Sequence, residues 1–238
     1  MSRRRQASLP ACGAGVSRGK KPMVIARRNA LLLFFAIALS GCKIVDNKDL
    51  MAARAKSDSE FDAAAYVDKI WESKALPEFK SKAVDLDTVL QAVAEDPDRA
   101  GKTYGQRAGE GNPWTYEIKG QGKVVAVDTA SRHAILTVDA ETKSGPRKVD
   151  LQVGPVVFGT AVRDALPFIH FGDFVNQIQY AQVSRALNDR AARNVRDSFD
   201  PKDAVGKTIV FHAAAVLSGG DTITATPVLI EAAKGEKT

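Results

Sequence analysis

Cysteine is nearly absent from this 238-residue chain, which contains only Cys12 and Cys42. Removal of a signal peptide would discard Cys12, and a lipid would occupy the sulfur of Cys42. Neither cysteine then remains as a free thiol for a disulfide, a metal site or a nucleophile. Histidine is scarce as well, and His133, His170 and His212 lie far apart without carboxylates at metal-ligand spacing. Neither a Gly-x-Ser-x-Gly elbow nor a dinucleotide-binding glycine motif occurs. We therefore expect no catalytic residues, no metal site and no enzyme activity.

Long apolar runs are also missing, with one exception, Ala30–Ala38. This run follows Arg27 and Arg28 and is too short to cross a bilayer as a stable helix, which is typical of a secretory signal. It ends in Leu39–Cys42, which resembles the lipobox of bacterial lipoproteins. The resemblance implies cleavage between Gly41 and Cys42, a diacylglyceryl group on the Cys42 sulfur, and a further acyl chain on the new amine. We expect this covalent lipid, in place of any cofactor, to anchor the protein durably.

Removal of the signal changes the charge. The chain carries 34 Lys and Arg against 28 Asp and Glu, a net charge of +6. Residues 1–41 hold eight of the basic residues and no acidic one, so the mature part carries 26 against 28, or −2. The apparent basicity therefore predicts no polyanion partner. Met23 would itself open a signal of ordinary length, and we favour it as the true start.

Two helices are expected before residue 100. Ser57–Glu60 resembles a capping box, so we place the start of a helix there. Pro77 is expected to end it. The apolar residues that follow the box have the spacing of one buried stripe: Ala63, Tyr66, Val67, Ile70 and Trp71. A second helix should run from Asp85 or Asp87 to just before Pro97, with the acids as caps and not as metal ligands. Five glycine and proline residues predict a loop over residues 100–113.

From Trp114 the pattern becomes strand-like. Three strand-like segments are predicted, at residues 123–128, 134–139 and 147–153, and the last of them alternates cleanly. Residues 156–162 look like another extended run, in which Gly159 suggests a bulge or a sharp bend. Asp173 is expected to cap a helix that runs toward Val195, with a break near Asn188. Two further strands, 207–212 and 222–230, should be joined by a turn at residues 218–221.

This order of three strands, a helix and two strands predicts a mainly β, α+β fold. An OB-fold-like barrel of five strands with an N-terminal helical arm has this order, and closure of its sheet removes the exposed edges. Other small barrels and an open α+β sheet can have the same order of elements. We divide the chain into a signal peptide, a tether, a helical arm with its Gly-rich loop, and the barrel, at residues 1–41, 42–57, 58–111 and 112–238.

Several separate segments resemble a domain-of-unknown-function family of predicted periplasmic lipoproteins. The matching segments are Trp71, Tyr104–Arg107, Gly154–Val156, Gly159–Ala165, Phe168–Phe171, Phe174–Gln177, Ala186–Asn188 and Gly206–Thr208. The resemblance implies an OB-like barrel, membrane tethering, and genes that lie beside those of sugar ABC-transporter components. It implies no established activity.

Candidate ligand-binding or partner-binding residues gather between positions 163 and 177. Arg163, Asp164, Phe168, Asn176 and Gln177 combine polar groups for hydroxyls with an aromatic face, a mixture that commonly holds sugars. The alternative is structural: an ion pair, a barrel plug and a helix cap. Nucleic-acid binding is not expected, because the predicted second and third strands have no aromatic residue for base stacking.

Two functions remain open. The first is a membrane-tethered, periplasm-facing binding or accessory module that works with a sugar ABC-import system. The second is a structural or envelope-assembly lipoprotein that contacts another envelope protein and has no small-molecule ligand. The sequence does not distinguish the inner from the outer membrane.

Overall fold

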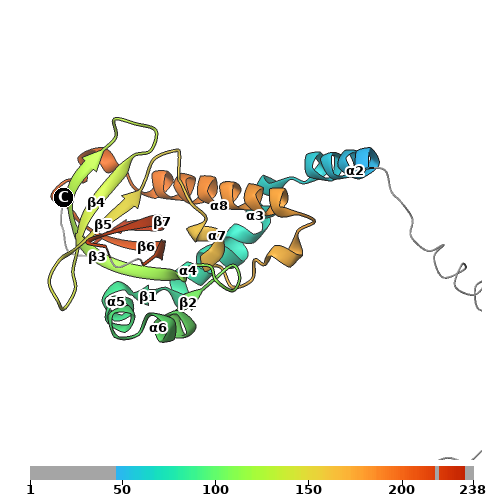
Figure 1. Ribbon diagram of the computed structural model, residues 1–238. Coiled ribbons are helices and arrows are strands. Elements are labelled where there is room, and N and C mark those ends of the chain that lie inside the picture. Colours follow the sequence, from blue (N-terminus) through green and yellow to red (C-terminus); the bar gives the residue numbers. More distant parts are fainter. Residues whose placement is uncertain (1–46, 218–219, 234–238) are drawn as a thin grey trace, which may run out of the picture. The chain divides into compact units, whose positions relative to one another are not determined.

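The core of the protein is a closed ring of five strands. The computed structural model describes residues 47–217 and 220–233, of which residues 52–217 and 220–233 form one compact unit. The strands are β3 (Thr115–Asp128), β4 (Ile135–Ala140), β5 (Arg147–Gln152), β6 (Thr208–Val216) and β7 (Thr222–Ala232). They pair in the order β3-β4-β5-β7-β6, and β6 returns to β3 (Figure 1). Only the β5–β7 pair of this ring is parallel. The predicted OB-like barrel is confirmed.

Ring closure depends on the length of β3. Its first part pairs with β6 over residues 115–123, and its second part pairs with β4 over residues 122–128. Gly122 lies where the two pairings overlap, and a Cβ atom there would lie 2.3 Å from the carbonyl oxygen of Asp139. A register shift between Val124 and Ala126 follows. The missing side chain and the bulge let one strand bend around the barrel.

Two apolar clusters stabilise the unit. The first fills the barrel with fully buried side chains from each strand, such as Ile118, Leu136, Leu151, Phe211 and Ile230. Leu86 and Val89 of α5 (Leu86–Glu95) belong to it. The second cluster joins α3 (Ala63–Ile70), η1 (Trp71–Ala75), α4 (Leu76–Lys82), α7 (Ala161–Ala165) and α8 (Gln177–Ser198) to one side of β6 and β7. The helices are therefore part of the packed structure of the barrel.

The N-terminal helices differ from the prediction. Residues 47–60 already form a helix, α2 (Asn47–Glu60), which includes Ser57–Glu60 and the described part of the predicted tether. The next helix, α3, is capped by Asp62, whose carboxylate accepts from Ala65 N at 2.9 Å. Pro77 does not end the helical segment but lies in the first turn of α4, after the π-helical turn η1. Proline fits there because the backbone N–H groups in the first turn of a helix make no hydrogen bond within that helix, so the missing N–H costs nothing.

The second predicted helix is confirmed as α5, with Asp85 as its cap, but the predicted loop at residues 100–113 is partly wrong. Asp96 caps a further helix, α6 (Pro97–Tyr104), and accepts from Arg99 N at 3.0 Å. A two-residue strand, β2 (Gly105–Gln106), follows and pairs with β3. Gly101 fits inside α6 because the indole of Trp114 packs against it, 2.3 Å from where a Cβ would lie. Tertiary packing thus favours glycine in this helix.

The predicted extended run at residues 156–162 is also wrong. No strand forms between Val153 and Thr160, and α7 begins at Ala161. Side chains satisfy the backbone there. Gln152 Oε1 accepts from Phe158 N at 2.8 Å, and Asn188 Nδ2 donates to Gly159 O at 2.9 Å. Gly159 has φ +91°, so it makes a left-handed turn in place of a strand bulge.

Helix α8 begins and ends later than predicted, and it is not broken. It runs unbroken through Asn188, and its cap is Asn176. Asp173 belongs to the short 3-10 turn η2 (Phe171–Asp173), where its carboxylate accepts from His170 N at 2.9 Å.

The short strand β1 (Val84–Asp85) pairs with β3, and the 3-10 turn η3 (Pro201–Asp203) precedes β6. Of the predicted turn at residues 218–221, positions 218 and 219 lie outside the described residues, as do Gly41 and Cys42.

Candidate functional site

Arg163 and Asp164 pair with each other. Both Nε and Nη2 of Arg163 approach Asp164 Oδ1, at 2.7 and 2.6 Å. The guanidinium lies 3.6 Å from the centre of the Tyr180 ring, and Thr160 Oγ1 donates to Asp164 Oδ2 at 2.6 Å. Arg163 is buried. These contacts join α7 to α8. They occupy the Arg163 guanidinium and the Asp164 carboxylate, the two groups with which a ligand would pair.

The predicted aromatic face is a packing cluster. Phe168 is half-buried against the second apolar cluster, with Lys74 Nζ at 5.8 Å from its ring centre. Phe174 contacts Phe61, Tyr66 and Tyr180 with ring centres 5.6 to 5.9 Å apart. Aromatic rings at these distances stabilise each other. The cluster holds the entry of α8 against α3.

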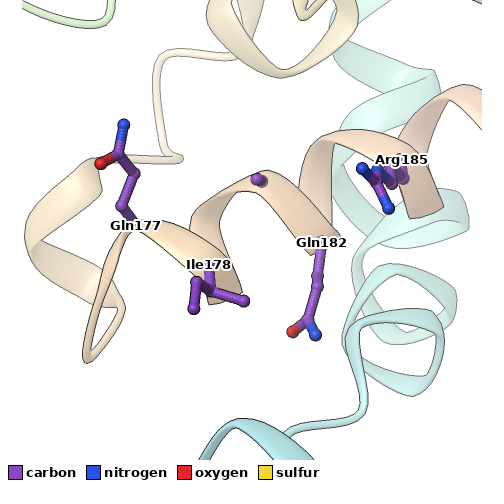
Figure 2. A pocket seen from close by; sticks show the side chains of 5 residues that line it. Gln177, Ile178, Gln182 and Arg185 are labelled. Atoms are coloured by element: carbon purple, nitrogen blue, oxygen red, sulfur yellow. The ribbon is translucent and has the colours of Figure 1, made fainter. Parts of the chain in front are cut away.

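Asn176 and Gln177 have different roles. Asn176 Oδ1 accepts from the backbone amides of Ile178 and Gln179, at 2.9 and 3.0 Å, as a helix cap does. Gln177 is exposed and lines a shallow hollow of about 440 Å³. The hollow is lined by one helix alone, through Gln177, Ile178, Ala181, Gln182 and Arg185 of α8. Figure 2 shows Gln177 and Gln182 pointing in opposite directions, so they do not converge on one ligand.

A better-enclosed site lies on the outer side of β3. It has a volume of about 300 Å³ and combines residues from α4, β1, α6, β2, β3, the end of α7 and the segment after it. We call it the Glu117 pocket. Its lining consists of Glu78, Lys82, Val84, Lys102, Thr103, Tyr104, Gly105, Gln106, Glu117, Ala165 and Pro167. The predicted segment 163–168 therefore contributes to this pocket through Ala165 and Pro167, and not through its charged pair.

The carboxyl of Glu117 is the unusual group in this pocket. The side chain is only 8% exposed, because β1 and β2 pair alongside this part of β3 and α4, α6 and α7 contact the strand. Its Oε1 is buried and has no hydrogen-bond partner within residues 47–217 and 220–233. Burial raises the pKa of the Glu117 carboxyl to about 8; repulsion by Glu78 adds to the rise and Lys82 opposes it. At neutral pH this carboxyl is mostly protonated.

A protonated carboxyl can donate one hydrogen bond and accept others. Thr103, Gln106 and Tyr104 add hydroxyl and amide groups to the lining, and Lys82 and Lys102 add ammonium donors. This arrangement suits a small polar ligand whose groups both donate and accept. In the part of the chain that the structure describes, no group of three or more histidine, cysteine or acidic residues could hold a metal ion.

Sequence reasoning missed Glu117. A single glutamate in an alternating strand ordinarily faces solvent, and nothing in residues 114–118 indicates that other segments cover it. The nearest signal was the segment Tyr104–Arg107, which carried part of the family resemblance and lines the pocket through Tyr104, Gly105 and Gln106.

No helix within the described ranges has the length and apolar character needed to span a bilayer.

Comparisons with known proteins agree on the family and the fold. Residues 32–231, a range that includes Leu39–Cys42, match the family described as predicted periplasmic lipoprotein (DUF2291). An OB-fold protein from Thermotoga maritima has a similar structure, with a TM-score of 0.56 and 20% sequence identity over 73% of this chain and 99% of that one. At this identity the likeness shows the fold alone. No curated protein sequence matches the chain. The protein therefore belongs to the DUF2291 family of predicted periplasmic lipoproteins, and has an OB fold.

Proposed function

We propose that this lipoprotein is a periplasmic binding module that holds a small hydroxyl-rich molecule, such as a monosaccharide, in the Glu117 pocket. The proposal depends on one observation: a buried carboxyl, which has no hydrogen-bond partner among the described residues, lines a polar pocket that is partly open to solvent. A buried polar group without a partner is costly, and a ligand hydroxyl would supply the missing bond.

The lining suits an uncharged polyol because it is rich in hydrogen-bonding groups and carries little net charge. With the Glu117 carboxyl protonated at neutral pH, the Glu78 carboxylate balances one of the two lysines, Lys82 and Lys102. The volume of about 300 Å³ is at the lower end for small-molecule sites.

The ligand test is a titration of the purified lipidated protein in detergent with pentoses, hexoses and deoxysugars, by calorimetry and thermal shift. We expect saturable binding of at least one sugar. Glu117→Leu should weaken that binding by about tenfold or more, which is 1.4 kcal/mol. The exposed Glu110 provides the matched control, Glu110→Leu, which should bind as the wild type does. A panel without any binder would contradict the proposal.

An accessory role beside a sugar ABC importer is part of the proposal and rests on the resemblance of the sequence segments. It predicts that the importer's membrane subunits co-purify with the lipoprotein after mild crosslinking in cells that take up the bound sugar.

The second candidate is an envelope-assembly lipoprotein that acts through protein contacts. Three apolar side chains at the entry of α8 favour it, because Phe171, Val175 and Ile178 are 49%, 73% and 56% exposed. Replacing Val175 and Ile178 with serine would then abolish crosslinking to an envelope partner and leave sugar binding unchanged.

A further inference from the structure

A second pocket lies at one end of the barrel, away from Glu117. Its volume is about 620 Å³, and it is formed by α5, the start of α6, the β4–β5 loop, the start of β5 and the residue after β6. We call it the Arg147 pocket. It is lined by Asp87, Leu90, Gln91, Val93, Ala94, Pro97, Thr142, Ser144, Gly145, Pro146, Arg147 and Leu217. It shares no residue with the Glu117 pocket.

One wall of the Arg147 pocket is apolar. Leu90 and Val93 of α5 and Leu217 at the end of β6 are half-buried and pack against the barrel core, so they hold fixed positions. Ala94 and Pro97 are exposed beside them. Burial of an apolar ligand against this wall would be favourable, because it removes apolar surface from water.

The β4–β5 loop is fixed on the opposite side. Asp87 Oδ1 accepts from Lys143 N at 3.0 Å, and Asp87 Oδ2 accepts from Gln91 Nε2 at 2.7 Å. Lys143 Nζ lies 3.7 Å from the same carboxylate. The only acidic side chain that lines the pocket is thus already compensated.

Arg147 is the uncompensated charge. It is half-buried, and it forms no ion pair with any residue in the described ranges. Its Nη2 donates to the carbonyl oxygen of Gly220, which fixes the orientation of the guanidinium. Its Nε is buried and has no acceptor among the residues that the structure describes. Guanidinium groups held in this way pair with carboxylates.

We propose that the Arg147 pocket is a second binding site, specific for a small monocarboxylate with an apolar body. The carboxylate pairs with the Arg147 guanidinium, and the apolar body packs on Leu90, Val93 and Leu217. This site does not depend on the function proposed for the Glu117 pocket.

Phenylacetate and its neutral analogue phenylacetamide test the site. Each is titrated into the lipidated protein in detergent, with empty micelles as the blank, and binding is measured by calorimetry and by saturation-transfer NMR. We expect saturable phenylacetate binding that is about tenfold or more tighter than phenylacetamide binding. Arg147→Gln should remove this preference. Lys148→Gln also removes one positive charge, but Lys148 is exposed and does not line the pocket. This variant should keep the preference for phenylacetate.

A second variant covers the case in which Arg147→Gln does not fold. Ala94→Trp leaves Arg147 in place and fills the pocket from an exposed position of α5, so it should reduce phenylacetate binding without changing the melting temperature by more than a few degrees. Equal binding of the acid and the amide overturns the proposal. So does the absence of saturable phenylacetate binding, or binding that both variants leave unchanged.

Discussion

The buried carboxyl of Glu117 makes the free energy of unfolding depend on pH. Its folded-state pKa of about 8 lies above the ordinary value of 4.5, so the folded protein keeps a proton that the unfolded chain loses. The free energy of unfolding therefore falls as the pH rises from 4.5 to about 8, by up to about 1.4 kcal/mol per pH unit. Above this range the contribution of Glu117 no longer changes.

The prediction is that Glu117→Gln, which cannot ionise, removes this fall. Urea unfolding at pH 5, 6.5 and 8 should show the wild type losing stability relative to the variant with each step. Glu110→Gln is the control, because Glu110 is exposed, and it should keep the wild-type dependence. Parallel curves for the wild type and Glu117→Gln would show that Glu117 ionises normally.

Arg163 is expected to contribute to stability, since its side chain and that of Asp164 are only 9% and 15% exposed. Arg163→Ala should lower the free energy of unfolding by about 3 kcal/mol, because it leaves the Asp164 carboxylate buried without its partner. The double variant Arg163→Met with Asp164→Leu should recover much of this loss. Chemical denaturation of the three proteins measures the difference. A fully stable Arg163→Ala would instead return Arg163 to the candidate ligand-binding residues.

At the scale of the element, capping decides where α8 begins. Asn176→Ala removes the acceptor for two backbone amides and should cost about 1 kcal/mol of stability. Asp173→Ala removes an exposed bond within η2 and should cost less than about half of that. Thermal unfolding of both variants shows which substitution lowers the melting temperature more. The reverse order would place the cap at Asp173, where the sequence pattern had predicted it.

At the scale of the whole molecule, the lipid anchor is the property with the widest consequence. Intact-mass spectrometry of the protein from membranes should show a chain that starts at Cys42 and carries a diacylglyceryl group. Cys42→Ala should keep the residues before position 42 and carry no lipid. Asp46→Ala, a control change just outside Leu39–Cys42, should be processed as the wild type is. An unmodified wild-type sulfur would contradict the expected anchor.

The strand order was predictable because each strand is a short local run rich in β-branched and apolar residues, and Arg147–Gln152 alternates as well. The errors occurred where distant groups satisfy the backbone. Asn188 holds Gly159 through a bond across 29 positions, so the predicted strand there does not form. Likewise, Trp114 packs on Gly101 and favours a helix in a stretch that resembles a loop. Among the candidate binding residues, the pairing of Arg163 with Asp164 was one of the alternatives that the sequence left open.

The sequence by itself determined the family and the OB-type order of strands, because these depend on local patterns of residues. Only the tertiary structure decided which polar groups lack partners. The pockets at Glu117 and Arg147 each combine segments that are far apart in the chain, from α4 to the segment after α7 and from α5 to Leu217. Burial and hydrogen-bond saturation are properties of that assembled arrangement, so no local pattern distinguishes these two side chains from ordinary surface charges.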